Sequence, residues 1–168
     1  ATKLGLPQEE QDLIFKAAPM HDIGKIGIPD SILLKPGRLT AEEYAVMKGH
    51  AQLGFQLLDG SESKVLQMGA LIAYSHHEKF DGTGYPRALA GEAIPLCGRI
   101  VAVADVFDAL VSERPYKRAW PYEKAFAFLD KGANTHFDGA CVEVCLRHQD
   151  EILAIRACFQ EDYSNDEL

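Results

Sequence analysis

The segment LCGRIVAVADVFDALVS, residues 96–112, is apolar on nearly all sides when it is placed on a helix. Because a helix that is apolar all round has to be covered by other elements, this segment predicts a buried central helix. The carboxylate of Asp105 lies within the apolar run. A buried charge without a partner costs several kcal/mol, so Asp105 needs an ion pair, hydrogen bonds or a metal ion. If it forms an ion pair, Arg99 and Arg114 are the nearest candidates.

Other segments carry helical signals that place further helices around this one. Residues 7–20 have acidic residues in their first turn, and Pro19 is expected to kink or end that helix just before His21. Residues 40–58 open with Thr40 and Glu43 at the spacing of a capping box, and they keep an apolar stripe. These two segments therefore predict helices whose ends are defined by local chemistry.

Further helices are expected at residues 61–77, from a Ser61 cap to a histidine pair, at 121–132, and at 139–159, where the helix is divided in two. Between them, residues 78–95 are rich in Gly and Pro and show no helical period. Long loops of this kind in compact domains tend to be functional. Because no strand alternation is present, the sequence predicts an all-α, single-domain helical bundle.

The composition limits the kind of partner. The formal net charge of −8 and the pI near 5.2 argue against a broad surface for a nucleic acid polymer or an anionic membrane. No apolar run reaches the roughly 20 residues of a membrane span, so we expect no membrane insertion of this segment. Four cysteines without a C-x-x-C pair are typical of reduced core thiols, which predicts a cytoplasmic protein.

Four of the six histidines fall between residues 21 and 77, together with a suggestive bend, HDIGKIGIPD. His21 directly precedes Asp22, Lys25 follows three residues later, and His76 and His77 form an adjacent pair before the Gly-rich loop. Any one of these histidines, His50 included, could be a structural residue or a metal ligand. At a helix end that frays before a Gly-rich loop, both members of the pair can turn toward one metal.

Two carboxylates match these imidazoles. Asp22 and Asp105 complete a mixed histidine and aspartate set, which suits Fe, Mn or Zn rather than a thiolate-bound structural zinc. A single aspartate that bridges two ions about 3.5–4 Å apart would clamp a phosphoryl group. Lys25 would then supply a point charge for a phosphate oxygen, although a solvated lysine is the alternative.

Three further residues have two interpretations each. Arg114 and Lys117 follow the central helix and could hold a second phosphate, or they could compensate the dipole at the end of the helix. Tyr85 lies beside the glycines of FDGTGYP, where it could stack on a base or take part in ordinary turn packing.

Together, these segments resemble the HD-GYP family, the bacterial cyclic di-GMP phosphodiesterase branch of the HD-domain metal-dependent phosphohydrolases. The resemblance runs in register over residues 17–138 and rests on four ordered stretches: HDIGKIGIPDSILLKPGRLT, MKGHAQLGFQLL, HHEKFDGTGYP and RIVAVADVFDALVSERPYKRAW. A lone HD doublet is a weak signal, whereas four ordered stretches that include GYP are highly specific.

The resemblance implies hydrolysis of cyclic di-GMP to pGpG, GMP or both in bacterial second-messenger signalling. It implies two divalent metals, or three in the full-length protein, with Fe or Mn favoured among the divalent ions. The implied metal ligands are His21, Asp22, His50, His76, His77 and Asp105. Asp22 corresponds to the bridging aspartate and Lys25 to the lysine on the scissile phosphate, and these two are the catalytic residues. Implied substrate contacts are Lys25, Tyr85, Arg114 and Lys117.

The family pattern also sets expectations for the whole protein. Family members carry a further helix upstream of the HD doublet, with a histidine ligand, whereas no histidine precedes His21 here. We therefore expect residues 1–168 to be one N-terminally truncated HD-GYP domain that lacks its first helix, with an upstream receiver or sensor domain. A homodimer and a GGDEF-type cyclase domain are candidate partners. A weak or inactive signalling module, or an enzyme for another cyclic dinucleotide, are the alternative functions.

Overall fold

The computed structural model of the protein describes residues 1–113 and 118–165. Within these ranges all regular secondary structure is helical, apart from two isolated bridges, which confirms the predicted all-α fold. The α-helices are α1 Gln8–Ala17, α2 Asp30–Leu33, α3 Ala41–Lys48, α4 His50–Leu58, α5 Lys64–Ala73, α6 Leu96–Val111, α7 Tyr122–Lys131, α8 Gly139–Arg147 and α9 Gln149–Asn165. Short 3₁₀ helices are η1 Thr2–Leu4, η2 Ala18–Met20, η3 Ile23–Gly27 and η4 Gly91–Ala93. No helix in the described part of the chain is long and apolar enough to cross a lipid bilayer.

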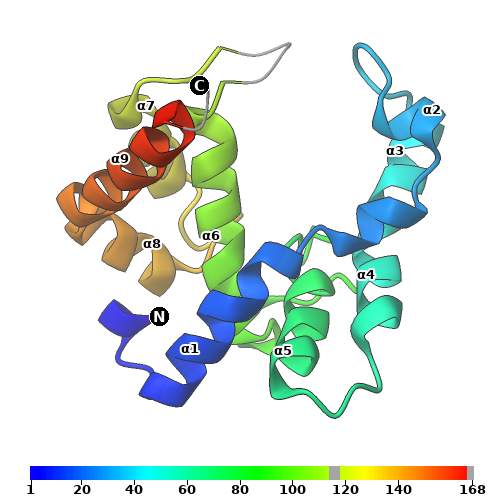
Figure 1. Ribbon diagram of the computed structural model, residues 1–168, viewed down its shortest axis with the longest axis horizontal. Helices are drawn as coiled ribbons and strands as arrows, with labels where there is room; N and C mark the ends of the chain where they lie inside the picture. The colour runs from blue at the N-terminus through cyan, green and yellow to red at the C-terminus, as the bar shows by residue number, and fades with distance from the viewer. Residues whose placement is uncertain (114–117, 166–168) are drawn as a thin grey trace.

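The helix α6 is central, as its apolar sequence predicts, and it divides the molecule into two halves (Figure 1). On one side, Phe107 and Leu110 pack with residues of α7 and α8, such as Phe126, in the larger apolar core. On the other side, Val101 joins Ile72 in a second core with α1 and α5. Burying these two faces is the main stabilising contribution that the hydrophobic effect makes to the fold.

The expectation that α6 is buried all round is wrong for one stripe of the helix. Ala104 and Asp108 are exposed, and 27% of the Asp105 side chain is accessible. The stripe is open because α1 covers only part of this side of α6, and the uncovered part borders a cavity. The carboxylate of Asp105 therefore lies at the boundary between the core and solvent.

The predicted helix ends are confirmed in part. The Thr40 hydroxyl accepts a hydrogen bond from the Glu43 amide at 3.2 Å, and the Glu43 carboxylate accepts one from the Thr40 amide at 2.7 Å, which is the expected capping box. The single helix expected at 40–58 is instead two helices, α3 and α4, which meet at Gly49. The prediction of a break in the last helix is confirmed, because α8 ends at Arg147 and α9 begins at Gln149.

The helix expected at 61–77 is shorter than its apolar pattern suggests. The Ser61 hydroxyl accepts the amide of Ser63 and does not cap the helix, which begins at Lys64. At the other end α5 stops at Ala73, and a tighter turn follows in which the Ser75 amide donates to the carbonyl of Ile72. His76 and His77 therefore lie just beyond the helix rather than within it.

The bend that holds Asp22 lies directly on α4. Pro19 lies in η2, which ends α1 before His21, as predicted. Gly24 in η3 is buried so closely against α4 that an added Cβ atom would lie 2.0 Å from the carbonyl oxygen of His50 and 2.4 Å from the amide of Gly54. Only a residue without a side chain allows this approach, which brings the bend beside His50.

Candidate metal centre

Three of the four clustered histidines are oriented by the backbone that precedes them. Nδ1 of His21 lies 2.8 Å from the carbonyl oxygen of Ala18, and Nδ1 of His50 lies 2.8 Å from that of Met47. Nδ1 of His76 lies 3.1 Å from the carbonyl oxygen of Ile72. A carbonyl only accepts, so each Nδ1 carries a proton, and in the neutral form of each ring Nε2 keeps a free lone pair. This is the tautomer and the arrangement found around metal-binding histidines.

Asp22 lies at the centre of the group, and its two oxygens face different residues. Oδ1 is 3.3 Å from Nε2 of His50 and 3.9 Å from Nε2 of His76. Oδ2 is 2.5 Å from Nζ of Lys25 and 3.4 Å from Nε2 of His21. The carboxylate of Asp22 therefore lies between His50 and His76 on one side and His21 on the other.

Asp22, His50, His76 and His77 bring one donor atom each within 4.8 Å of one another. Among the described residues, Nε2 of His76 is buried without a hydrogen-bond partner, and Nε2 of His77 lies 3.1 Å from Nε2 of His50. A buried polar atom without a partner is unfavourable, and a cation between the donors would relieve this cost. Three imidazoles and one carboxylate thus fit a divalent metal ion by their chemistry as well as by their spacing.

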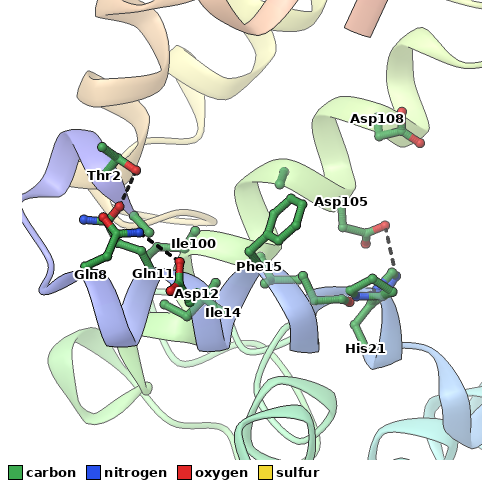
Figure 2. A pocket seen from close by; sticks show the side chains of 15 residues that line it. Thr2, Gln8, Gln11, Asp12, Ile14, Phe15, His21, Ile100, Asp105 and Asp108 are labelled. Atoms are coloured by element: carbon green, nitrogen blue, oxygen red, sulfur yellow. Dashed lines mark hydrogen bonds and ion pairs between the residues drawn. The ribbon is translucent and has the colours of Figure 1, made fainter. Parts of the chain in front are cut away.

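A second group lies on the other side of Asp22. Nε2 of His21 is 3.7 Å from Oδ1 of Asp105, so the bend after η2 and the helix α6 each present one potential ligand here. Figure 2 shows these two side chains facing each other at one end of a cavity of about 710 Å³, which Phe15, Ile100 and Asp108 also line. A ligand can therefore reach His21 and Asp105 from this cavity.

The environment keeps Asp22 and three of the four imidazoles in the form that binds metals, whereas it favours the protonated form of His21. Burial lowers the pKa of His76 to about 4 and that of His77 to about 2, and it lowers the pKa of His50 as well. All three imidazoles are therefore neutral at pH 7. Burial would raise the pKa of Asp22, but hydrogen bonds from His21 and Lys25 outweigh it and hold this pKa well below its usual range. The pKa of His21 is raised, chiefly by its hydrogen bond to Asp22.

Tyr85 adjoins the cluster through His77. Their rings are stacked with centroids 4.7 Å apart and an angle of 28° between the planes. Nζ of Lys48 lies 5.8 Å from the centroid of the same tyrosine ring and 5.4 Å from that of Tyr44. Sequence reasoning had not selected Lys48, whose position at the end of α3 looks like that of any solvated lysine.

The remaining predicted residues have different outcomes. Arg99 forms an ion pair with Asp138 at 2.5 Å, not with Asp105 as one alternative had it. Asp108, a residue on the exposed stripe of α6 that is not among the predicted site residues, accepts hydrogen bonds from Arg156 and Ser112. Arg114 and Lys117, the predicted phosphate contacts, lie outside the described residues. The structure therefore brings together the six predicted metal ligands, Lys25 and Tyr85.

Comparisons with known proteins give a consistent result. The model of a family described as "HD domain" matches residues 1–141. The chain is 58% identical over 147 residues, 88% of its length, to "Cyclic di-GMP phosphodiesterase response regulator RpfG" of Xanthomonas campestris pv. campestris, and covers 39% of that protein. It is 51% identical over 152 residues, 90% of its length, to the "Cyclic di-GMP phosphodiesterase" of Thermotoga maritima, and covers 41% of it. Against "3'3'-cGAMP-specific phosphodiesterase 2" of Vibrio cholerae the identity is 48% over 153 residues, 91% of this chain and 29% of the relative.

A solved structure shares the fold. The crystal structure of a cyclic GMP-AMP specific phosphodiesterase of V. cholerae, V-cGAP3, matches with a TM-score of 0.64. The match covers 89% of this chain and 40% of that chain at 22% identity, so the likeness concerns the fold alone. The chain spans well under half the length of the curated relatives described above, between 29% and 41%.

Proposed function

The chain belongs to the HD domain family, in its HD-GYP branch, and on that premise we propose that it is a metal-dependent phosphodiesterase domain that hydrolyses cyclic di-GMP. Divalent metal binding is a property of this family, and the number and identity of the metals are part of the proposal. The observation that carries it is the buried Nε2 of His76, which has no hydrogen-bond partner in residues 1–113 and 118–165 and lies beside three other donors in metal-ligand spacing. The names of the relatives support the choice of substrate.

We assign the donors to two metals that share Asp22. His50, His76, His77 and Asp22 would hold one ion, and His21, Asp105 and Asp22 the other. Imidazole and carboxylate ligands without thiolates suit Fe, Mn or Zn, and the family resemblance favours Fe or Mn among them. When bound, such ions supply Lewis acidity at a phosphate oxygen. A third metal, expected for longer members of the family, would need ligands beyond those named here.

The protein's own residues bind and orient the substrate. Lys25 presents its ammonium beside Asp22, where it would hold a phosphate oxygen and stabilise the negative charge that develops on it. Tyr85, whose pKa is raised by burial, keeps its proton and offers a ring at the edge of the cluster for the substrate. Arg114 and Lys117 would contact the second phosphate, as the family resemblance implies.

Metal analysis paired with turnover tests this proposal. We expect close to two Mn or Fe ions per chain in protein purified without chelator, and pGpG or GMP formed from cyclic di-GMP. Asp22→Asn should lose metal and turnover together, whereas Asp59→Asn, which changes an exposed aspartate at the end of α4, should keep both. Protein that holds metal but produces neither product would support a signalling module without activity.

A second substrate has a specific observation in its favour. One relative with 48% identity carries the name of a 3'3'-cGAMP-specific phosphodiesterase, so cyclic GMP-AMP is the main competitor for cyclic di-GMP. Comparing kcat/KM for the two dinucleotides under one metal condition would decide between them. A preference for cyclic GMP-AMP would keep the reaction class and change the substrate.

The organisation of the whole protein is also proposed. We infer that residues 1–168 form a single HD-GYP domain that works with an upstream receiver or sensor domain in the cytoplasm. The relative from Xanthomonas campestris, which is named as a response regulator, supports the first part, and four free cysteines support the second. A homodimer and a cyclase-domain partner follow only from the family resemblance.

A further inference from the structure

Glu78 directly follows the histidine pair, and its side chain is buried although no cation pairs with it among the described residues. Only 3% of the residue is exposed to solvent. One carboxylate oxygen accepts the backbone amide of Arg87 at 2.8 Å, and the other accepts that of Leu89 at 3.0 Å. A buried carboxylate is costly unless it is well hydrogen-bonded, so these two bonds explain why it is tolerated in this position.

The two bonds tie the segment 84–89 to the turn that carries the histidines. Gly84 lies so close to this turn that an added Cβ atom would be 2.2 Å from the amide nitrogen of Lys79 and 2.5 Å from Cα of Glu78. The amide of Tyr85 donates to the carbonyl oxygen of His77 at 3.2 Å. The backbone of the segment is therefore fixed on both sides of Tyr85.

This matters because His77 is held differently from the other clustered histidines. His21, His50 and His76 each direct Nδ1 to a backbone carbonyl, but within the described residues His77 makes no such bond. Its ring contacts those of His76 and His50, with centroids 3.9 Å and 4.9 Å away, and its one stacked contact among the described residues is with Tyr85 at 4.7 Å. With the ring held there, Nε2 points at Nε2 of His50, 3.1 Å away.

We propose that Glu78 is a positioning residue for the metal centre. Its carboxylate holds the segment 84–89 in place, the segment presses Tyr85 against His77, and the stack keeps Nε2 of His77 directed at the other donors. The inference rests on the metal-binding part of the proposed function but not on the identity of the substrate.

The test is the metal affinity of Glu78→Gln. Glutamine keeps the shape but offers one acceptor oxygen, so one of the two amides would face an NH₂ donor. Residues that orient metal ligands typically change affinity by about 10–100-fold when they are altered, and we expect a loss in that range. Titrating metal-free protein with Co²⁺, whose visible spectrum depends on its ligands, should show weaker binding and an altered spectrum.

Two control variants separate positioning from general destabilisation. Glu92→Gln makes the same chemical change at an exposed residue of the same loop and should bind Co²⁺ like the unaltered protein. Leu129→Ala creates a cavity in the larger core between α6 and α7, away from the metal centre, and lowers stability without touching the ligands. If Leu129→Ala weakens Co²⁺ binding as much as Glu78→Gln at equal loss of Tm, the role of Glu78 is merely structural.

A double-mutant cycle tests the route through Tyr85. Tyr85→Leu should weaken Co²⁺ binding in the same direction, and the double variant should bind no more weakly than the weaker single variant, because both changes release the same ring. Independent, additive losses would overturn the proposal, as would unchanged affinity in folded Glu78→Gln. A different outcome is that the unaltered protein binds Co²⁺ and the variants lose affinity as expected, but the unaltered protein hydrolyses no cyclic dinucleotide. The proposed function then fails and this inference stands.

Discussion

Replacing His76 with leucine should stabilise the metal-free protein, because the role proposed for this residue is metal binding and not folding. Within the described part of the chain, its Nε2 is buried without a hydrogen-bond partner. Leucine fills the same space with apolar atoms. The carbonyl of Ile72, which Nδ1 of His76 contacts, also accepts the backbone amides of Ser75 and His76, so it does not lose its last partner.

The size of the gain follows from these contacts. Removing an unsatisfied buried polar atom gains about 1–3 kcal/mol, and losing the Nδ1 bond costs about 0.5–1.5 kcal/mol, which leaves a net gain of about 1 kcal/mol near pH 7.5. The gain should grow in acid. The pKa of His76 falls from 6.5 to about 4 on folding. Between these pH values the unfolded chain binds more protons, so the unaltered protein loses stability as the pH drops.

At pH 5.5 this linkage adds about 1.4 kcal/mol to the difference between the two proteins. The free energy of unfolding of the leucine variant should then exceed that of the unaltered protein by more than about 2 kcal/mol. Urea denaturation followed by far-UV circular dichroism, in EDTA at pH 7.5 and pH 5.5, measures both differences. With Mn²⁺ at 100 times its Kd, binding adds about 2.7 kcal/mol to the unaltered protein only, and the order should reverse at pH 7.5.

His148→Leu is the matched control, since His148 lies outside the cluster and contacts the exposed Glu151 at 3.0 Å. We expect no gain from it in EDTA. A His76→Leu variant that is less stable than the unaltered protein in EDTA at both pH values would refute the reasoning, because Nε2 would then have a favourable partner in the folded protein.

Three further predictions follow from the same geometry. Lys25→Met should lower kcat for cyclic di-GMP by about 10²–10³-fold while elemental analysis finds the metal content unchanged. Loss of the metals would show instead that Lys25 is needed for metal binding. Gly24→Ala should lower the free energy of unfolding by more than about 3 kcal/mol, because its Cβ would lie 2.0 Å from the carbonyl oxygen of His50. A small change in the denaturation midpoint would contradict that close packing. Burial raises the pKa of Cys141 to about 12. A thiol reagent at pH 8 should therefore label exposed Cys158 at once and Cys141 only after unfolding. Equal labelling rates for the two cysteines would contradict the burial of Cys141.

Much of the site was predictable because its residues sit in short local patterns. The HD bend, the histidine pair before the glycines and Asp105 in an apolar helix are each visible in a few letters of sequence. Their convergence was not deducible from spacing alone, since it depends on the close packing of Gly24 against α4. The family resemblance supplied that part of the prediction.

Other features depend on contacts that no local pattern reveals. Gly49 separates α3 from α4 although its backbone is right-handed helical, with φ −61° and ψ −19°, so the apolar stripe continues across the break. Glu78 looks like a solvated acid in a polar loop, and its burial arises only when residues 87 and 89 fold back over it. Lys48 gains its neighbours Tyr44 and Tyr85 in the same way.

The ligand residues come from four separate parts of the chain: the bend after α1, the first residue of α4, the turn after α5 and the middle of α6. In a zinc finger the metal drives folding, because the unligated chain has too little core of its own. Here two apolar cores hold the helices together, and the donors meet only once those helices have packed. During biogenesis, metal uptake should therefore be the last step, after the chain has folded. On the proposed function, a cell short of the metal would then keep a reserve of folded, metal-free protein that can be activated without new synthesis.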